Sequence, residues 1–307
     1  MDHYREVLAA TRSQWAHSVA RRRRRRTGLG LAASAAAALV VVGLVTRFDD
    51  GDTGPLVVAA ADAMVGDIEF RSPTAADWTA LTAPGVAITR GTRIRTAEDG
   101  RAGLRLEDGT SLRLDQTSEI SFDGAGRVRL ARGVVYIDTG SDPGPARRVE
   151  VVTPAGVVWD VGTQFEVRYR ADTLTLRVRE GRVILEREAD EIQGVAGEQV
   201  RLDRDGRVER TAFSPFDAEW RWVQAVAPLP YEDTLTVHEL LEWVARETGR
   251  EVHFSEPGLA TRASRTILHG NPHRLLPMEA LAVMLATTDL TYTVAADGEI
   301  LIAATPQ

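Results

Sequence analysis

The stretch LRLEDGTSLRL, residues 104–114, decides the fold class of this chain. Leucine alternates with arginine on both sides of Asp108-Gly109, so the leucines fall on one face of an extended strand and the arginines on the other. The glycine after the aspartate supplies the positive φ that a tight hairpin needs. The stretch therefore predicts a β-hairpin with one apolar, buried face and with Arg105 and Arg113 in water.

The same alternation continues through residues 57–212, the acidic middle of the chain. Apolar and polar residues alternate again over 128–130 and 174–179, and further Gly-containing turn signals follow at Asp99-Gly100, Asp123-Gly124, Glu180-Gly181 and Asp205-Gly206. Many short strands at this spacing are typical of an all-β sandwich, barrel or solenoid-like stack. The arginines of residues 174–179 are expected on the solvated face.

The N-terminal end differs from the rest of the chain. Residues 1–47 hold nine arginines against two acids, including the unbroken run Arg21 to Arg26, and residues 27–46 carry no charge. A helix of that length covers roughly 30 Å, the thickness of a bilayer's hydrocarbon. The sequence predicts a single-pass membrane protein with a transmembrane helix over 27–46, a basic cytoplasmic tail over 1–26 and a linker over 47–56. The alternative is a cleaved signal peptide of the twin-arginine type.

The tail carries one apolar stripe, formed by Tyr4, Leu8, Trp15 and Val19 at near-helical spacing. Two interpretations stay open: an interfacial helix that lies on anionic lipid, or a helix that docks in a partner's groove. The remainder of the chain is acidic and would be repelled by phosphate, so we expect no direct contact with nucleic acid.

The period of the sequence changes after a connector over 213–230. Thr236 and Glu239 form a capping-box pattern before an apolar helix, and Gly249 stands where a C-cap belongs. A strand follows, and the same helix–strand order recurs after Pro277. Residues 231–304 are therefore predicted to form a small α/β domain.

No motif of the chain indicates an enzyme. The chain has no cysteine, and the phosphate-loop, dinucleotide, zinc-protease and nucleophile-elbow motifs are missing from the sequence. His269 and His273 are separated by Gly270, Asn271 and Pro272, so they do not share a helical face as metal ligands would. We expect no catalytic residue, no metal site and no cofactor.

Five ordered motifs in the middle region resemble the FecR family. They are LEDGTSLRL (106–114), LARGVVY (130–136), VVTPAG (151–156) with VGTQF (161–165), VREGRV (178–183) and AGE (196–198). The motif positions that we interpret as structural are Asp108, Gly109, Gly133, Gly162, Thr163, Phe165 and Gly181; Gly162 is expected to mark a β-bulge.

Residues 240–249 and 279–292 resemble the short N-terminal domain that secretins share with TonB-dependent transducers, a protein-docking module. The two resemblances together imply a FecR-like anti-sigma or sigma-regulator protein of the inner membrane, with its N-terminus cytoplasmic and its folded domains periplasmic. The implied partners are an extracytoplasmic-function sigma factor, bound through the stripe of the tail, and a TonB-dependent transducer or other envelope protein. The alternative is an envelope scaffold that binds another envelope protein or a cell-wall polymer without sigma-factor control.

Overall fold

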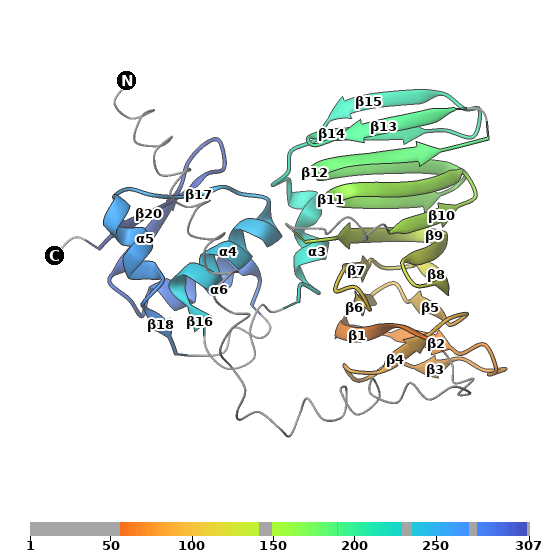
Figure 1. Cartoon of the computed structure of the whole chain (residues 1–307), viewed down its shortest axis with the longest axis horizontal. Helices are drawn as coiled ribbons and strands as arrows, with labels where there is room; N and C mark the ends of the chain where they lie inside the picture. Colours follow the sequence, from red (N-terminus) through yellow and green to blue (C-terminus); the bar gives the residue numbers. More distant parts are fainter. Residues whose placement is uncertain (1–55, 141–148, 189, 229–234, 270–274, 306–307) are drawn as a thin grey trace, which may run out of the picture.

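The computed structural model describes residues 56–140, 149–188, 190–228, 235–269 and 275–305. It contains a stack of β-strands over residues 57–212, which we call the β stack, and a smaller α/β unit over residues 235–304 (Figure 1). The tail stripe and the predicted transmembrane helix lie outside the described residues.

The β stack has two layers, as the strand pairings show. The first layer is antiparallel and follows the order β4-β1-β6-β7-β9-β11-β12-β14-β15. These strands are β1 (Val57–Val65), β4 (Ala87–Thr89), β6 (Arg101–Leu106), β7 (Ser111–Leu114), β9 (Arg127–Asp138), β11 (Gly156–Arg170), β12 (Thr173–Glu186), β14 (Glu198–Leu202) and β15 (Val208–Ala212).

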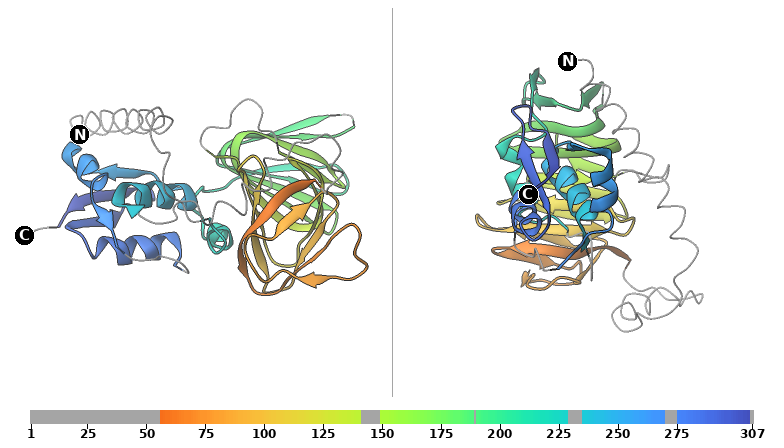
Figure 2. Two further views of the ribbon diagram at one scale, coloured as in Figure 1. Left: turned by 60° about the horizontal axis from the view of Figure 1, so that its bottom comes forward. Right: turned by 90° about the vertical axis from the view of Figure 1, so that its left-hand side faces the viewer.

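The second layer follows the order β3-β2-β5-β8-β9-β10-β11-β12-β13, with one parallel pair, β9 and β10. Its remaining strands are β2 (Ile68–Arg71), β3 (Thr79–Ala80), β5 (Arg93–Thr96), β8 (Glu119–Gly124), β10 (Glu150–Thr153) and β13 (Glu191–Val195). The long strands β9, β11 and β12 belong to both layers, and the left-hand view of Figure 2 shows the strands curving round a common interior.

The interior of the β stack is aliphatic, as the alternating sequence predicts. Leu104, Leu112 and Leu114 from the first layer and Ile94 and Ile120 from the second belong to one buried cluster and are at most 1% exposed. The expected hairpin at Asp108-Gly109 is confirmed, because β6 and β7 pair in antiparallel register and Gly109 has φ 88°.

Glycines sit where the long strands turn from one layer into the other. Gly133 of β9 has φ 101°, and a Cβ there would lie 2.4 Å from Cα of Ser118. Gly181 of β12 has φ 77°, and a Cβ there would lie 2.5 Å from the carbonyl oxygen of Gly162 on β11. The register between β11 and β12 shifts between Val161 and Gln164, which agrees with the expected bulge at Gly162.

Two of the predicted turns are wrong. Glu180-Gly181 lies inside β12 and Asp123-Gly124 lies at the end of β8. At Gly181 the positive φ serves a bulge within a continuous strand rather than a hairpin, and the turn after β8 uses Gly126 instead, with φ 66°. A glycine after an acid thus marks the positive φ without saying whether the chain reverses there.

The single-pass membrane class needs correction. Among the described residues, no helix combines the length and the apolar character that crossing a bilayer requires. The longest helix described, α4 (Val237–Thr248), has 12 residues and covers about 18 Å, against roughly 30 Å of hydrocarbon. The described chain is a mostly β structure with a small α/β unit, and residues 27–46, on which that prediction depended, lie outside it.

The α/β unit is built from short helices on a three-stranded sheet. The sheet order is β17-β20-β19, with β17 and β20 parallel and β19 and β20 antiparallel. The other elements of the unit are helices and a two-stranded ribbon of β16 and β18. The bounds are β16 (Leu235–Thr236), β17 (Val252–Phe254), α5 (Pro257–Ala263), β18 (Ile267–Leu268), α6 (Pro277–Leu285), β19 (Leu290–Val294) and β20 (Ile300–Ala304).

The predicted helix ends are confirmed in α4. Thr236 Oγ1 accepts a hydrogen bond from the Glu239 backbone at 3.2 Å, and the Glu239 carboxylate accepts one from Thr236 N at 3.0 Å. Gly249 ends the helix with φ 69°. The helix–strand order also recurs as predicted, in α4–β17 and α6–β19, but in α6 only Glu279 caps, because Leu276 offers no side-chain oxygen.

The connector between the two parts contains the 3-10 turn η1 (Ala218–Trp220) and the short helix α3 (Arg221–Gln224). Trp220, Trp222 and Val223 pack against Val134 and Tyr136 of β9 in a separate small core. This core lies on the outer face of the first layer, and it is the reason why that face is covered rather than solvated at its centre.

Candidate functional site: a buried polar junction beneath helix α4

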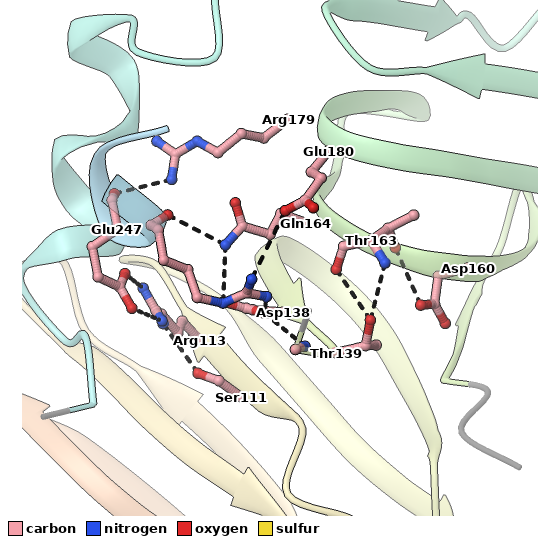
Figure 3. A network of polar contacts seen from close by, with 12 residues as sticks. Ser111, Arg113, Asp138, Thr139, Asp160, Thr163, Gln164, Arg179, Glu180 and Glu247 are labelled. Carbon is pink, nitrogen blue, oxygen red and sulfur yellow. Dashed lines mark hydrogen bonds and ion pairs between the residues drawn. The ribbon is translucent and has the colours of Figure 1, made fainter. Parts of the chain in front are cut away.

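The polar network of Figure 3 joins the outer face of the first β layer to the C-terminal end of α4. Its β-stack members lie on β7, β9, β11 and β12, and its α/β members are Arg246 and Glu247. We call this set of contacts the junction. It is the place where two parts far apart in the sequence are held together by charged side chains.

Arg113 and Glu247 form the centre of the junction. The Arg113 Nη1 and Nη2 atoms donate to the two Glu247 carboxylate oxygens at 2.5 and 2.9 Å, and the side chains are 0% and 4% exposed. Arg113 also donates to the Val223 carbonyl of α3 and to Ser111 Oγ, each at 3.1 Å. The buried guanidinium is therefore hydrogen-bonded on several sides, as a charge removed from water must be.

A second pair lies beside the first. Arg246 Nε donates to Asp138 Oδ2 at 2.9 Å, and its Nη2 forms a close ion pair with the other carboxylate oxygen. Gln164 of β11 donates to the same Asp138 oxygen at 3.0 Å and to the Arg246 carbonyl at 3.3 Å. The amide of Gln164 thus ties β9, β11 and α4 to one another.

Arg179 of β12 closes the junction on its remaining side. Its Nη1 donates to the Glu247 carbonyl at 3.0 Å, and its guanidinium lies 4.4 Å from the centre of the Trp220 ring. The Nε and Nη2 atoms of Arg179 are buried, and no described residue forms a hydrogen bond with them. The cation–π contact with Trp220 replaces water around this part of the guanidinium.

The charges of the junction are mutually stabilised. Burial opposes the charged form of Arg113, but the facing Glu247 outweighs it and raises the pKa of the guanidinium above its usual value. Burial also opposes the charged form of Asp138, but the facing Arg246 outweighs this effect and lowers the pKa of the carboxyl. Burial, together with the nearby charges of Asp138 and Glu247, raises the pKa of Tyr136, which packs in the same layer. Arg113, Asp138 and Arg246 therefore stay charged at neutral pH.

A neighbouring set of contacts anchors the connector to the same layer. Glu166 of β11 is fully buried, accepts from Trp222 Nε1 at 3.0 Å and pairs with Arg168 at 3.1 Å. Arg177 of β12 pairs with Glu219 of η1 at 2.6 Å. The indole and guanidinium groups hold the connector in place, which brings α3 and then α4 onto the layer.

Three arginines that the sequence placed in water are buried. Arg113, Arg177 and Arg179 are 0%, 8% and 5% exposed, whereas Arg105 and Arg129, from the same alternating pattern, are exposed as expected. The alternation correctly separates the two faces of each strand, but it cannot tell that α3 and α4 cover the second face. Glu247 is the sequence signal for this, because it continues the apolar stripe of Leu240 and Val244 along α4.

The family-motif positions lie around the junction rather than in it. Thr163 donates to Asp160 at 3.1 Å, its backbone N–H donates to Thr139 Oγ1 at 3.0 Å, and Phe165 is buried in the interior. Asp108 caps the hairpin turn by accepting from Thr110 N at 2.9 Å. Within the VGTQF motif, Gln164 is the residue whose side chain reaches the junction, as those of Arg113 and Arg179 do from two other motifs, and sequence reasoning missed all three.

The contacts of the junction are hydrogen bonds and ion pairs that hold α4 on the first layer. Among the described residues, the one group of side chains that could hold a metal ion is Glu251, His253 and Glu299, in the α/β unit and outside the junction. The tail residues Tyr4, Leu8, Trp15 and Val19 lie outside the described residues, so their relation to the junction stays a prediction.

Residues 92–184 match the family model described as FecR protein. The chain carries a FecR domain. The match begins in front of β5 and ends in β12, so it contains every β-stack residue of the junction network, from Ser111 to Arg179. The resemblance read from the sequence motifs is thereby confirmed for this domain, while the resemblance of the C-terminal part to the secretin and TonB module stays a prediction.

Two solved structures share overall similarity with the chain. Both are of a candidate anti-sigma factor from Parabacteroides distasonis ATCC 8503, with 14% and 15% sequence identity and a TM-score of 0.38 each. Each alignment covers 70% of this chain and 99% of the other. No curated protein matches the chain. Because these TM-scores are below 0.5, the fold is described from the strand pairings given above and not from these two structures.

Proposed function

We propose that this chain is a FecR-domain regulator of a sigma factor, and that the sigma factor belongs to the extracytoplasmic-function class. The match of residues 92–184 to the FecR family carries the proposal. The described residues hold a buried polar junction, and the sequence holds no motif of a catalytic site. On this proposal the FecR domain and the α/β unit face the envelope and receive its signal.

The junction gives the two parts a route of communication. Arg113, Asp138, Gln164 and Arg179 belong to the FecR domain, and each contacts the last turn of α4. A partner that displaces α4 would have to break both ion pairs, and partner binding that is compatible with the closed junction would preserve them. We propose the predicted α/β domain, residues 231–304, as the docking module for a TonB-dependent transducer or another envelope protein.

The proposed sigma-binding element is the tail over residues 1–26. Tyr4, Leu8, Trp15 and Val19 would form the apolar face of a helix that docks in a groove of the sigma factor, with Trp15 as its anchor. Aromatic anchors dominate such helix-in-groove contacts, so the loss of Trp15 should weaken binding most.

The test compares the full chain with the variant Trp15→Ala and the matched variant Trp78→Ala. Trp78 is a tryptophan of the β stack, close to Arg71 and Arg95 and remote in sequence from the tail. Capture of the extracytoplasmic-function sigma factors of the same organism is measured together with sigma-dependent transcription in cells. We expect Trp15→Ala to reduce capture at least tenfold and to change transcription, with Trp78→Ala unchanged in both.

The opposite outcome favours the envelope scaffold. If the full chain captures no sigma factor, and deletion of residues 1–26 leaves transcription unaltered, then sigma-factor control is excluded. Binding of another envelope protein or a cell-wall polymer under the same conditions would then describe the function of the FecR domain and the α/β unit.

A further inference from the structure

Glu251, His253 and Glu299 meet where two parallel strands of the α/β unit begin. Glu251 immediately precedes β17 and Glu299 immediately precedes β20, and these strands pair in parallel with His253 opposite Leu301 (Figure 1). Glu251 and His253 are two residues apart on an extended segment, so they share one face of the sheet. The backbone N–H of Ile300 donates to the Glu251 carbonyl at 2.8 Å, which fixes the two acidic positions side by side.

The distances within this group are those of metal ligands. His253 Nε2 lies 3.4 Å from Glu251 Oε2 and 3.5 Å from Glu299 Oε2, and one ligand atom from each residue lies within 4.8 Å of the others. Metal–ligand bonds of about 2.1 Å in a tetrahedron place neighbouring ligand atoms about 3.4 Å apart. Octahedral bonds of similar length, as for Mg²⁺, would place them about 3.0 Å apart, and the longer bonds of Ca²⁺ about 3.4 Å apart. The spacing therefore disfavours Mg²⁺, and the imidazole ligand favours Zn²⁺ over Ca²⁺.

The histidine itself points to a ligand. His253 is 5% exposed, and its buried Nε2 has no hydrogen-bond partner among the described residues although both carboxylates are near. The two distances of 3.4 and 3.5 Å count as ion-pair contacts only if the ring is protonated, and they do not meet hydrogen-bond geometry. A buried ring nitrogen that faces two carboxylate oxygens without bonding to either is what a bound cation would satisfy.

We propose that Glu251, His253 and Glu299 bind one divalent zinc ion. The ligand set of one imidazole and two carboxylates suits Zn²⁺, and three protein ligands leave the fourth position for water or for a group from a partner. The ion would neutralise the two carboxylates and link the starts of β17 and β20. The site stands on the α/β unit alone and does not depend on sigma-factor control.

The experiment titrates Zn²⁺ into the metal-stripped full chain in competition with a fluorescent zinc indicator. The site variants are His253→Ala and Glu299→Gln. The controls are His238→Gln, because His238 faces one carboxylate, Glu242, at 3.5 Å but no second one, and Glu256→Gln, an exposed acid at the start of α5. Mg²⁺ and Ca²⁺ are titrated in parallel.

We expect one Zn²⁺ per chain at a site whose affinity falls about tenfold or more in His253→Ala and Glu299→Gln and is unchanged in both controls. Zn²⁺ should also raise the melting temperature of the full chain and of the controls, and not that of the two site variants. This second readout distinguishes a built site from ions held at the remaining histidines.

Three results would overturn the proposal. They are the absence of stoichiometric binding, binding that persists unchanged in His253→Ala and Glu299→Gln, and binding of Ca²⁺ or Mg²⁺ as tight as that of Zn²⁺. If Glu299→Gln is folded, as circular dichroism would show, its loss of binding cannot be ascribed to unfolding.

Discussion

Arg113 on β7 and Glu247 on α4, separated by 134 residues, form a bidentate ion pair, and the Arg113 side chain is fully buried. Such a pair contributes little net stability compared with two well-packed apolar residues, because both charges lose their hydration. Removing one partner is a different matter, since it leaves a lone charge buried. The pair therefore specifies one position of α4 on the FecR domain. Any other position of the helix would leave a buried charge unpaired, which is energetically unfavourable.

The first prediction concerns this asymmetry. Arg113→Met should lower the free energy of unfolding by about 3–5 kcal/mol, and Glu247→Leu by a similar amount, because each leaves an unpaired buried charge. The double variant Arg113→Met/Glu247→Leu should recover most of that loss. Urea denaturation of the full chain and the three variants measures it.

The matched control for this prediction is the exposed pair of Arg105 and Asp62, whose side chains are 49% and 30% exposed. Arg105→Met should change the free energy of unfolding by less than about 1 kcal/mol. An Arg113→Met variant as stable as Arg105→Met would show that the junction does not hold the buried pair described here.

The second prediction is a pH dependence that arises from Asp138. Arg246 lowers the pKa of this carboxyl in the folded chain, so the ionised form is favoured by folding. Its contribution to stability is complete above the unfolded pKa of about 3.9 and is lost as the pH falls from there through the folded pKa. Below about pH 4 the junction should therefore weaken, as tryptophan fluorescence from Trp220 and Trp222 would report.

Asp138→Asn isolates this effect from the many other carboxylates. The variant should have a lower free energy of unfolding than the unsubstituted protein at neutral pH. This difference should shrink as the pH falls below about 4. A difference that stays constant across the acid range would contradict the assignment of that part of the pH dependence to Asp138.

The third prediction concerns the strand that turns between layers at Gly133. Gly133→Ala should cost about 1–2 kcal/mol for the positive φ and about 1–3 kcal/mol more for overpacking against Ser118. The control is Gly109→Ala, which has φ 88° but meets nothing within 4 Å and should incur only the first cost. Equal losses for the two variants in urea denaturation would show that the close approach at Ser118 is unimportant.

The sequence predicted the interior of the β stack better than its exterior. Alternation placed Leu112 and Leu114 inward with certainty, because a one-residue shift would reverse every side chain of β7. It also placed Arg113 outward, which is correct, but an outward side chain is solvated only when nothing covers it. The covering elements, α3 and α4, come more than 100 residues later in the chain.

The candidate site could not be predicted from the sequence for the same reason. The cap residues Thr236 and Gly249 were predictable because they interact with neighbours in the chain. Asp138, Gln164 and Arg246 interact only once three separate elements have met. Local sequence patterns do not predict how these elements pack together. The one signal is the charged Glu247 on an otherwise apolar stripe of α4.

The fourth prediction concerns motion at the junction. Arg246→Met removes the ion-pair partner of Asp138 and should weaken the packing of α4 on the first layer, so the connector over η1 and α3 should open more often. Amide hydrogen exchange of residues 218–224 should accelerate at least several-fold in this variant. Trp222 should also become more accessible to a fluorescence quencher, since it packs on the same layer.

The control for this experiment is Arg262→Met, which breaks the exposed pair with Asp289 in the same α/β unit, where the side chains are 48% and 65% exposed. Exchange of residues 218–224 should be unchanged in that variant, because its ion pair lies outside the junction. If Arg246→Met and Arg262→Met exchange alike, the pair of Arg246 and Asp138 does not fasten the connector, and the proposed route from the α/β unit to the FecR domain loses its physical basis.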